Sequence, residues 1–142
     1  MKHILTIFVF LLSINSSHAD YLKNKLEAKE LVKKIMAEVK LGNIEKGLGY
    51  TKPYLIIPMH EFEGVINSLK MQAPMIKQRF GETIGVEYID TEEIGKSLME
   101  VSYIQKFDKH LMRWKFYFYK GKGGWVLNTF STDDSIKAMF CH

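Results

Sequence analysis

The spacing of apolar residues changes at Gly81, and this change constrains the fold more than any other feature of the chain. Before Gly81, apolar residues recur every three to four positions, which is the spacing of an amphipathic helix. After Gly81 they alternate with polar residues, as in strands with one buried face. Helices followed by strands predict an α+β fold, with three N-terminal helices packed on a curved antiparallel sheet of about four strands.

Three helices are expected before the change. The first spans residues 20–41, where one face is apolar and the other is charged. The second is a short helix with an irregular exit within residues 43–57. The third begins at Pro58 and ends at Gly81, and Pro74 inside it should bend it, because proline removes one backbone hydrogen bond.

Four strands are expected after the change, with turns where glycine and polar residues gather. The expected strands span residues 84–90, 98–107, 111–120 and 125–130. The turns between them fall at residues 91–96, 108–109 and 121–124, and a last helical turn runs to Phe140.

The second and third strands can be paired from their side chains. A two-residue turn at Asp108 and Lys109 sets Tyr103 opposite Trp114, so one face of the hairpin is nearly all apolar. The other face is polar and carries Glu100, Ser102, Lys106, Arg113 and Lys115.

Extending this register across the glycine loop, with Tyr119 opposite Trp125, has two consequences. It places Asn128 on the apolar face beside Phe116. It also gathers four apolar residues on the reverse face, namely Tyr117, Tyr119, Trp125 and Leu127. Because such a strip is too apolar to face solvent, we expect it to form a homodimer interface. The alternative is that the C-terminal turn, with Ile136, Met139 and Phe140, folds over the strip.

The strand motifs resemble those of small exported bacterial proteins of the NTF2-like, or cystatin-like, superfamily. The resemblance rests on YIQKF at 103–107, WKFYFYK at 114–120 and GWVL at 124–127, followed by Phe130 and Asp133-Asp134. The earlier KPYL at 52–55 and RFG at 79–81 fit the same pattern. The resemblance implies a cone of three helices and a curved sheet. It does not select an activity, because this fold hosts isomerases, dehydratases, transport factors and non-catalytic binding subunits.

Residues 1–19 have the pattern of a cleavable signal peptide. A lysine precedes an apolar run over residues 4–14, and Ser17 and Ala19 are small residues at the positions that a signal peptidase recognises. The run is shorter than the roughly 20 residues that span a bilayer. We therefore expect export to the periplasm or the medium. Residues 20–142 then form a single domain without a stable membrane anchor.

Charge and cysteine content restrict the partners. The chain has 20 Lys and Arg against 16 Asp and Glu, and loss of Lys2 with the leader leaves an excess of three positive charges. The basic residues are spread along the sequence, so we expect no nucleic-acid partner. Cys141 is the only thiol, so no internal disulfide can form. We interpret it as an unpaired thiol, with a disulfide-linked dimer as the alternative.

No catalytic pair is visible in the sequence. His60, His110 and His142 fall at a helix start, a turn and the terminus, and the strand acids fall on the polar face or in turns. Acid–base catalysis needs groups that reach the same substrate, so we expect no catalytic residue. The loop at residues 121–124 joins two strands, whereas a phosphate-binding loop precedes a helix. With no metal-ligand spacing either, we expect no cofactor and no metal.

We therefore expect a non-catalytic binding module. It would take a small apolar or amphipathic ligand in the cone or a protein partner on the sheet. The ligand-pocket candidates are Asn128, Tyr103, Trp114, Phe116 and Tyr88, because binding pockets are mostly apolar with a few polar groups. One alternative is a small isomerase-type, dehydratase-type or hydrolytic enzyme, favoured if Glu87 or Glu100 points into the cone beside a tyrosine. Another is a purely structural dimeric subunit.

Overall fold

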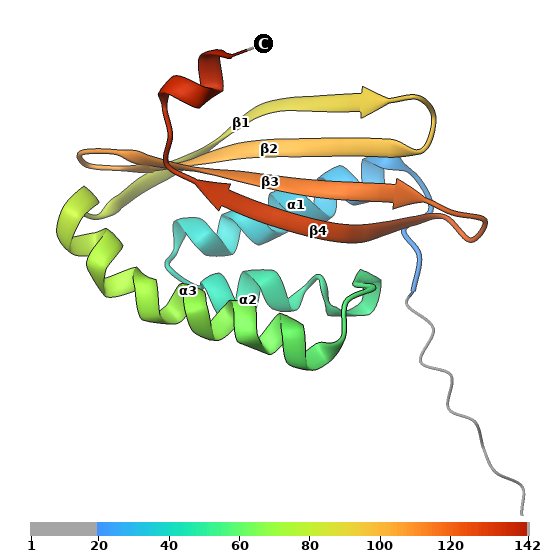
Figure 1. Cartoon of the computed structure of the whole chain (residues 1–142), viewed down its shortest axis with the longest axis horizontal. Coiled ribbons are helices and arrows are strands. Elements are labelled where there is room, and N and C mark those ends of the chain that lie inside the picture. Colours follow the sequence, from blue (N-terminus) through green and yellow to red (C-terminus); the bar gives the residue numbers. More distant parts are fainter. Residues whose placement is uncertain (1–19, 142) are drawn as a thin grey trace, which may run out of the picture.

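The computed structural model describes residues 20–141, so the predicted signal peptide lies outside the described residues. Within this range three α-helices precede an antiparallel sheet with the strand order β1-β2-β3-β4, which confirms the α+β prediction (Figure 1). The helices are α1 (Lys25–Lys40), α2 (Ile44–Gly49) and α3 (Met59–Phe80), with 3₁₀ turns η1 (Lys52–Tyr54) and η2 (Lys137–Phe140). The strands are β1 (Thr83–Ile94), β2 (Leu98–Phe107), β3 (Leu111–Lys120) and β4 (Trp125–Asp133).

Helix α1 begins five residues later than the sequence pattern predicts. The side chain of Asn24 accepts a hydrogen bond from the backbone N–H of Glu27 (2.9 Å), and the Glu27 carboxylate accepts one from the backbone N–H of Lys23 (2.7 Å). This pair is a variant of the capping box, because the Glu27 carboxylate accepts from the residue before the N-cap and not from the N-cap itself, and it fixes the helix start. The preceding residues are extended, and Leu22 exchanges two backbone hydrogen bonds with Trp125 (2.9 and 2.8 Å).

The sheet is curved, and three β-bulges contribute to its shape (Figure 1). In β1, Ile84 and Ile89 have no partner on β2, and in β4 Asn128 has no partner on β3. An extra residue bends its strand and increases the local twist. The three helices lie on one side of this sheet (Figure 1).

The core lies between the helices and the sheet. Trp114, Phe116 and Phe118 of β3 are fully buried there, together with residues from all three helices, including Ile35, Leu48 and Phe62. The rings of Trp114, Phe116 and Phe130 stack with centroids 6.0 to 6.5 Å apart. These aromatic side chains fill the space that the sequence analysis assigns to a ligand.

The register of β2 and β3 confirms the predicted hairpin, with Tyr103 opposite Trp114. The predicted register of β3 and β4 was wrong by one residue, because Trp125 lies opposite Lys120 and Leu127 lies opposite Phe118. The shift turns Trp125 and Leu127 toward the helices, where they are 2% and 0% exposed. Burying two such side chains contributes about 1.5–3 kcal/mol each, which favours the observed register.

Asn128 is the residue at which the register shifts again. It occupies the bulge of β4 and is exposed, and beyond it Phe130 returns to the helix side, opposite Phe116. The prediction that Asn128 is a buried amide between Phe116 and the third helix was therefore wrong. The unpaired residue increases the pairing offset from one position to two, so the residues beyond it face the predicted sides again. A uniform alternation pattern does not reveal such a bulge.

The side of the sheet away from the helices carries cross-strand ion pairs. Lys115 Nζ lies 3.0 Å from Glu100 Oε1, and Arg113 Nε lies 2.8 Å from Asp133 Oδ2. A third pair joins Lys106 and Glu87 at 3.6 Å. Opposite charges on directly paired or neighbouring strands stabilise a solvated sheet face.

The predicted strip of four apolar residues is not present on this side of the sheet. Of its four members, Tyr117 and Tyr119 stay on this face, while Trp125 and Leu127 are in the core. The predicted alternative cover is not in place either, because η2 follows the far end of β4 and Phe140 is 78% exposed. The observed face therefore does not support the predicted interface.

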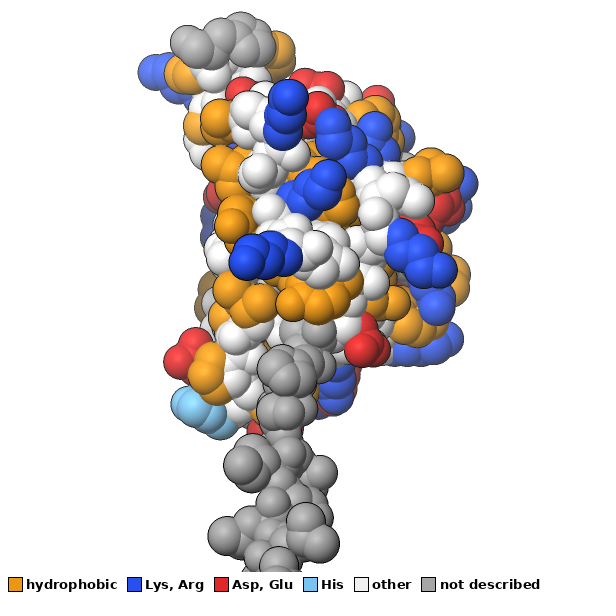
Figure 2. Space-filling model, turned by 90° about the vertical axis from the view of Figure 1, so that its right-hand side faces the viewer, with side chains coloured by type: hydrophobic (Ala, Val, Ile, Leu, Met, Phe, Trp, Pro, Cys, Tyr) orange, Lys and Arg blue, Asp and Glu red, His pale blue; other side chains and the backbone are white. Residues whose placement is uncertain are grey.

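The antiparallel order puts the β1–β2 turn and the β3–β4 loop at the same end of the sheet. The backbone N–H of Lys120 donates to Ser97 O (2.8 Å), and the segment before α1 joins them through its pairing with Trp125. Figure 2 views the molecule from this end. We call it the loop end, comprising residues 20–25, 95–97 and 119–126 and the adjoining residues 52–59.

Candidate functional site

Four of the five predicted ligand-pocket residues share the helix side of the sheet, where Tyr103 lies opposite Trp114 and Tyr88 lies opposite Tyr103. Trp114 and Phe116 are stacked in the core, and Tyr103 and Tyr88 form a second pair with ring centroids 5.5 Å apart. Asn128 lies apart from both pairs, exposed on its bulge. The hypothesis that Asn128 orients a ligand required a buried amide, so it was wrong.

A different amide occupies the buried position. Gln105 is 4% exposed, its side-chain oxygen accepts a hydrogen bond from Trp114 Nε1 (3.1 Å), and its side-chain nitrogen donates to Thr83 Oγ1 (2.9 Å). An unpaired buried amide would cost about 1–3 kcal/mol, so these bonds stabilise the fold and orient the indole. The β2–β3 register already placed Gln105 on the apolar face, and that was the signal available in the sequence.

The tyrosine pair has the chemistry of hydrogen-bond donors. Burial raises the pKa of Tyr103 above its usual value of 10.0, with smaller contributions from Tyr88 and Glu30. The hydroxyl of Tyr88 donates to Thr91 Oγ1 (2.9 Å). A phenol with a raised pKa stays protonated at neutral pH, so Tyr103 is a donor and not a base.

The carboxylates that would favour an enzyme lie on the other face of the sheet. Glu87 is paired in register with Ile104, and Glu100 with Tyr117, both on the side away from the helices. Both acids contact lysines there. Neither is beside a tyrosine of the core. Within residues 20–141 there is also no group of three or more His, Cys, Asp or Glu side chains that could hold a metal ion.

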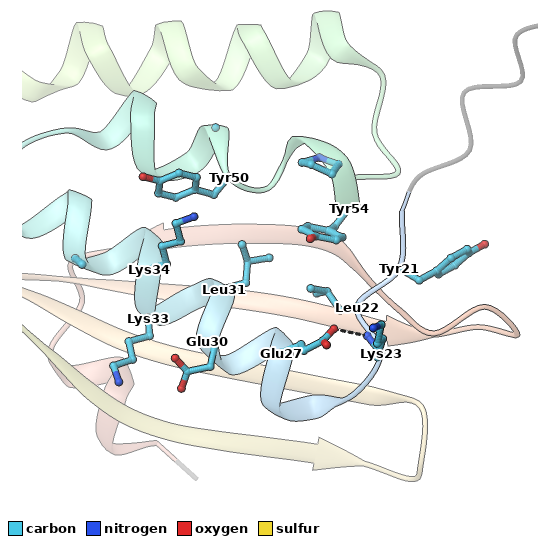
Figure 3. Close-up of a pocket in the computed structure, with 13 residues that line it drawn as sticks. Tyr21, Leu22, Lys23, Glu27, Glu30, Leu31, Lys33, Lys34, Tyr50 and Tyr54 are labelled. Atoms are coloured by element: carbon cyan, nitrogen blue, oxygen red, sulfur yellow. Dashed lines mark hydrogen bonds between the residues drawn. The ribbon is translucent and has the colours of Figure 1, made fainter.

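A groove with a volume of about 1030 Å³ lies between α1 and the segment formed by α2 and η1. We call it the α1–α2 groove. Its apolar and aromatic lining comes from Tyr21, Leu22, Leu31, Ala37, Tyr50, Pro53 and Tyr54, and its charged lining from Lys23, Glu27, Glu30, Lys33 and Lys34. In Figure 3, Tyr50 and Tyr54 lie across the groove from Leu31 and Lys34, whereas Glu30 and Lys33 point away from it.

Tyr50 is held in place from two sides. Lys34 Nζ lies 3.9 Å from the centroid of its ring, and its hydroxyl donates to Glu38 Oε1 (3.1 Å). Glu38 also accepts hydrogen bonds from Asn43 Nδ2 (3.1 Å) and lies 2.9 Å from Lys46 Nζ. The aromatic ring is therefore positioned before any ligand arrives, which lowers the entropic cost of binding.

The Glu38 contacts predict a pH dependence. The hydrogen bond from Lys46 lowers the pKa of Glu38 below its usual value of 4.5, and Asn43 and Tyr50 lower it further. A carboxyl whose pKa is lower in the folded than in the unfolded state stabilises the fold above the unfolded pKa. That contribution disappears as pH falls through the folded pKa. E38Q should therefore lower the melting temperature at neutral pH and lose its effect in acid.

Melting curves from pH 7 to below 4.5 check this expectation. E63Q is the matched control, because Glu63 is exposed and forms no ion pair within residues 20–141. A difference between E38Q and the wild type that stays constant down to low pH would contradict the assignment.

The sequence did not predict that the residues of the groove lie together, because they come from three separate segments. The spacing of Tyr50 and Tyr54 places both on one side of a short helical stretch, and this was the one local signal. Tyr21 gave none, since the predicted first helix included it.

No family model and no curated protein matches this sequence. None of the helices within residues 20–141 combines the length and the apolar character that crossing a membrane requires.

Proposed function

We propose that this protein is an exported, non-catalytic binding domain whose α1–α2 groove takes an extended segment of a protein partner. The export part rests on the pattern of residues 1–19. The order of three helices and a curved antiparallel sheet supports the NTF2-like assignment as part of this proposal.

The observation that carries the proposal is the shape and lining of the groove. Small ligands usually bury 70–90% of their surface, which requires an enclosed pocket. This groove is instead an open channel between two helical segments, with the rings of Tyr50 and Tyr54 on one side and charges of both signs in its lining. Tyrosine is enriched at protein interfaces because it offers apolar area with a polar tip. An extended peptide satisfies such a surface better than a compact small molecule.

Blocking the groove tests the proposal. Ala37 is exposed and lines the groove, so A37R fills it without disturbing the core. Peptides would first be selected from a random display library on the wild-type protein, and their dissociation constants then measured by calorimetry. A37R should weaken their binding at least about tenfold, the cost of about 1.4 kcal/mol that marks an energetically important position.

A138R is the matched control, because Ala138 is exposed on η2 and the substitution adds the same volume and charge away from the groove. It should leave peptide binding unchanged. Equal binding to A37R and wild type, or failure to select any peptide, would contradict the proposal. A melting-temperature increase with long-chain amphiphiles that A37R abolishes would instead assign the groove to a small amphipathic ligand.

A further inference from the structure

The loop end gathers lysines that are far apart in the sequence. Lys23, Lys96 and Lys120 line one hollow of about 610 Å³ together with Lys25 and Glu93. Lys25 is neutralised by Glu93, whose carboxylate lies 2.8 Å from its ammonium group. The sequence shows basic residues spread along the chain, but folding brings these to one end.

The other lysines of this end keep their charge available. Lys122 lies in the β3–β4 loop, two residues after Lys120. Lys23, Lys96, Lys120 and Lys122 are exposed, and none of them takes part in the ion pairs found within residues 20–141. The loop end therefore presents an excess of positive charge.

Exposed apolar side chains lie on the other side of the same loop. A cleft of about 870 Å³ is formed there by residues of the N-terminal segment, of the chain after η1 and of the β3–β4 hairpin. Ile56, Met59 and Tyr119 line it and are each about half exposed (53%, 46% and 48%). Figure 2 shows hydrophobic side chains between lysines across this face.

We propose that the loop end docks reversibly on the surface of an anionic lipid bilayer. Apolar side chains that enter the headgroup region, next to lysines that attract anionic headgroups, are the features of an interfacial membrane-binding surface. A second copy of this chain is a poorer occupant, because it would bring two sets of unpaired lysines together.

Co-sedimentation with vesicles tests the proposal, with phosphatidylcholine vesicles that contain phosphatidylglycerol compared with pure phosphatidylcholine. The protein is taken from the exported fraction, and its intact mass is checked first because a retained apolar leader would bind vesicles by itself. Binding should require phosphatidylglycerol and weaken as salt is raised. Each lysine near an anionic surface accounts for about a fivefold change in affinity, so K96Q/K120Q/K122Q should bind about a hundredfold more weakly.

The matched control neutralises three exposed lysines at the opposite end, K40Q/K109Q/K137Q, and changes the net charge equally. It should alter binding less than about fivefold, the effect of one lysine at the surface. A second pair of variants separates the apolar contribution. I56S/M59S should weaken binding at every salt concentration, while M71S/M75S, which changes two exposed methionines of α3, should not.

Equal loss of binding in the two lysine variants would overturn the proposal, because vesicle binding would then depend on the net charge of the protein and not on the lysines of the loop end. Equal binding to pure phosphatidylcholine would also overturn it. Binding to soluble poly-glutamate without binding to vesicles would assign the lysines to an acidic macromolecule instead. A dimer of the wild-type protein in analytical ultracentrifugation without vesicles, absent in I56S/M59S, would overturn the proposal and assign the loop end to a second copy.

Discussion

L127A should lower the free energy of unfolding by about 2–5 kcal/mol, the usual range for deleting a buried leucine side chain. Leu127 is fully buried, lies opposite Phe118 and is bridged to Leu55 on its other side. Its truncation leaves a cavity at the point where β4, β3 and the chain after η1 meet. Denaturation in urea, followed by tryptophan fluorescence, measures the effect.

N128A is the control, and it should change stability by less than about 0.5 kcal/mol because the side chain is exposed on a bulge. The register expected from uniform alternation predicts the reverse order, with residue 128 buried and residue 127 exposed. The two substitutions therefore decide between the registers. A loss for L127A no larger than that for N128A would contradict the observed one.

G124A should destabilise the protein by at least about 2 kcal/mol. The backbone of Gly124 has φ of +136°, a conformation that residues with a Cβ rarely adopt. A Cβ at this position would also lie 2.6 Å from the carbonyl oxygen of Leu22. That oxygen accepts a hydrogen bond from Trp125, so relief of the contact would loosen the N-terminal segment from β4.

Two measurements check this expectation: urea denaturation and the rate of tryptic cleavage after Lys23, which should rise when the segment detaches. G121A is the matched control within the same loop. Its Cβ would make an ordinary contact, 3.6 Å from the Tyr119 ring, and its φ is not in the positive range. If G124A and G121A lower the stability of the protein equally, neither the positive φ of Gly124 nor its contact with the Leu22 carbonyl accounts for the loss, and the expectation is contradicted.

The elements that could be predicted are those with strong local signals. Helix α3 lies between Pro58 and Gly81 as expected, because proline suits a helix start and Gly81 ends the helix with φ of +87°. Strands β2 and β3 match the predicted ranges, since a two-residue turn leaves little freedom in register.

The errors arose where contacts between distant segments decide the structure. The predicted first helix included residues 20–24, but these residues precede the helix, and Leu22 among them pairs with Trp125 of β4. The glycine loop at 121–124 does not by itself fix the register between β3 and β4. That register depends instead on which side chains of β4 the helices can bury. The bulge at Asn128 then reverses the alternation once more.

The candidate sites were invisible for the same reason. Leu31 and Tyr54 line the groove from separate segments, and Lys23, Lys96 and Lys120 line one hollow at the loop end from three separate segments. Trp114 and Phe116 lie on the apolar face as predicted, but they were assigned to a ligand pocket, and they are stacked and fully buried in the core instead. An apolar face seen in a sequence does not distinguish a packed core from a cavity.

The bulges also bear on how the folded protein avoids aggregation. β1 and β4 are the two edges of the sheet, and an exposed edge offers unpaired backbone groups to any other extended chain. β1 carries two bulges and four acidic residues, and β4 is bridged by Leu22 and Leu55 near its start and is interrupted at Asn128 beyond them. Neither edge strand is therefore long and flat enough to pair along its whole length with a strand of another chain. The chain thereby resists edge-to-edge polymerisation through its backbone shape, without a disulfide to restrain it.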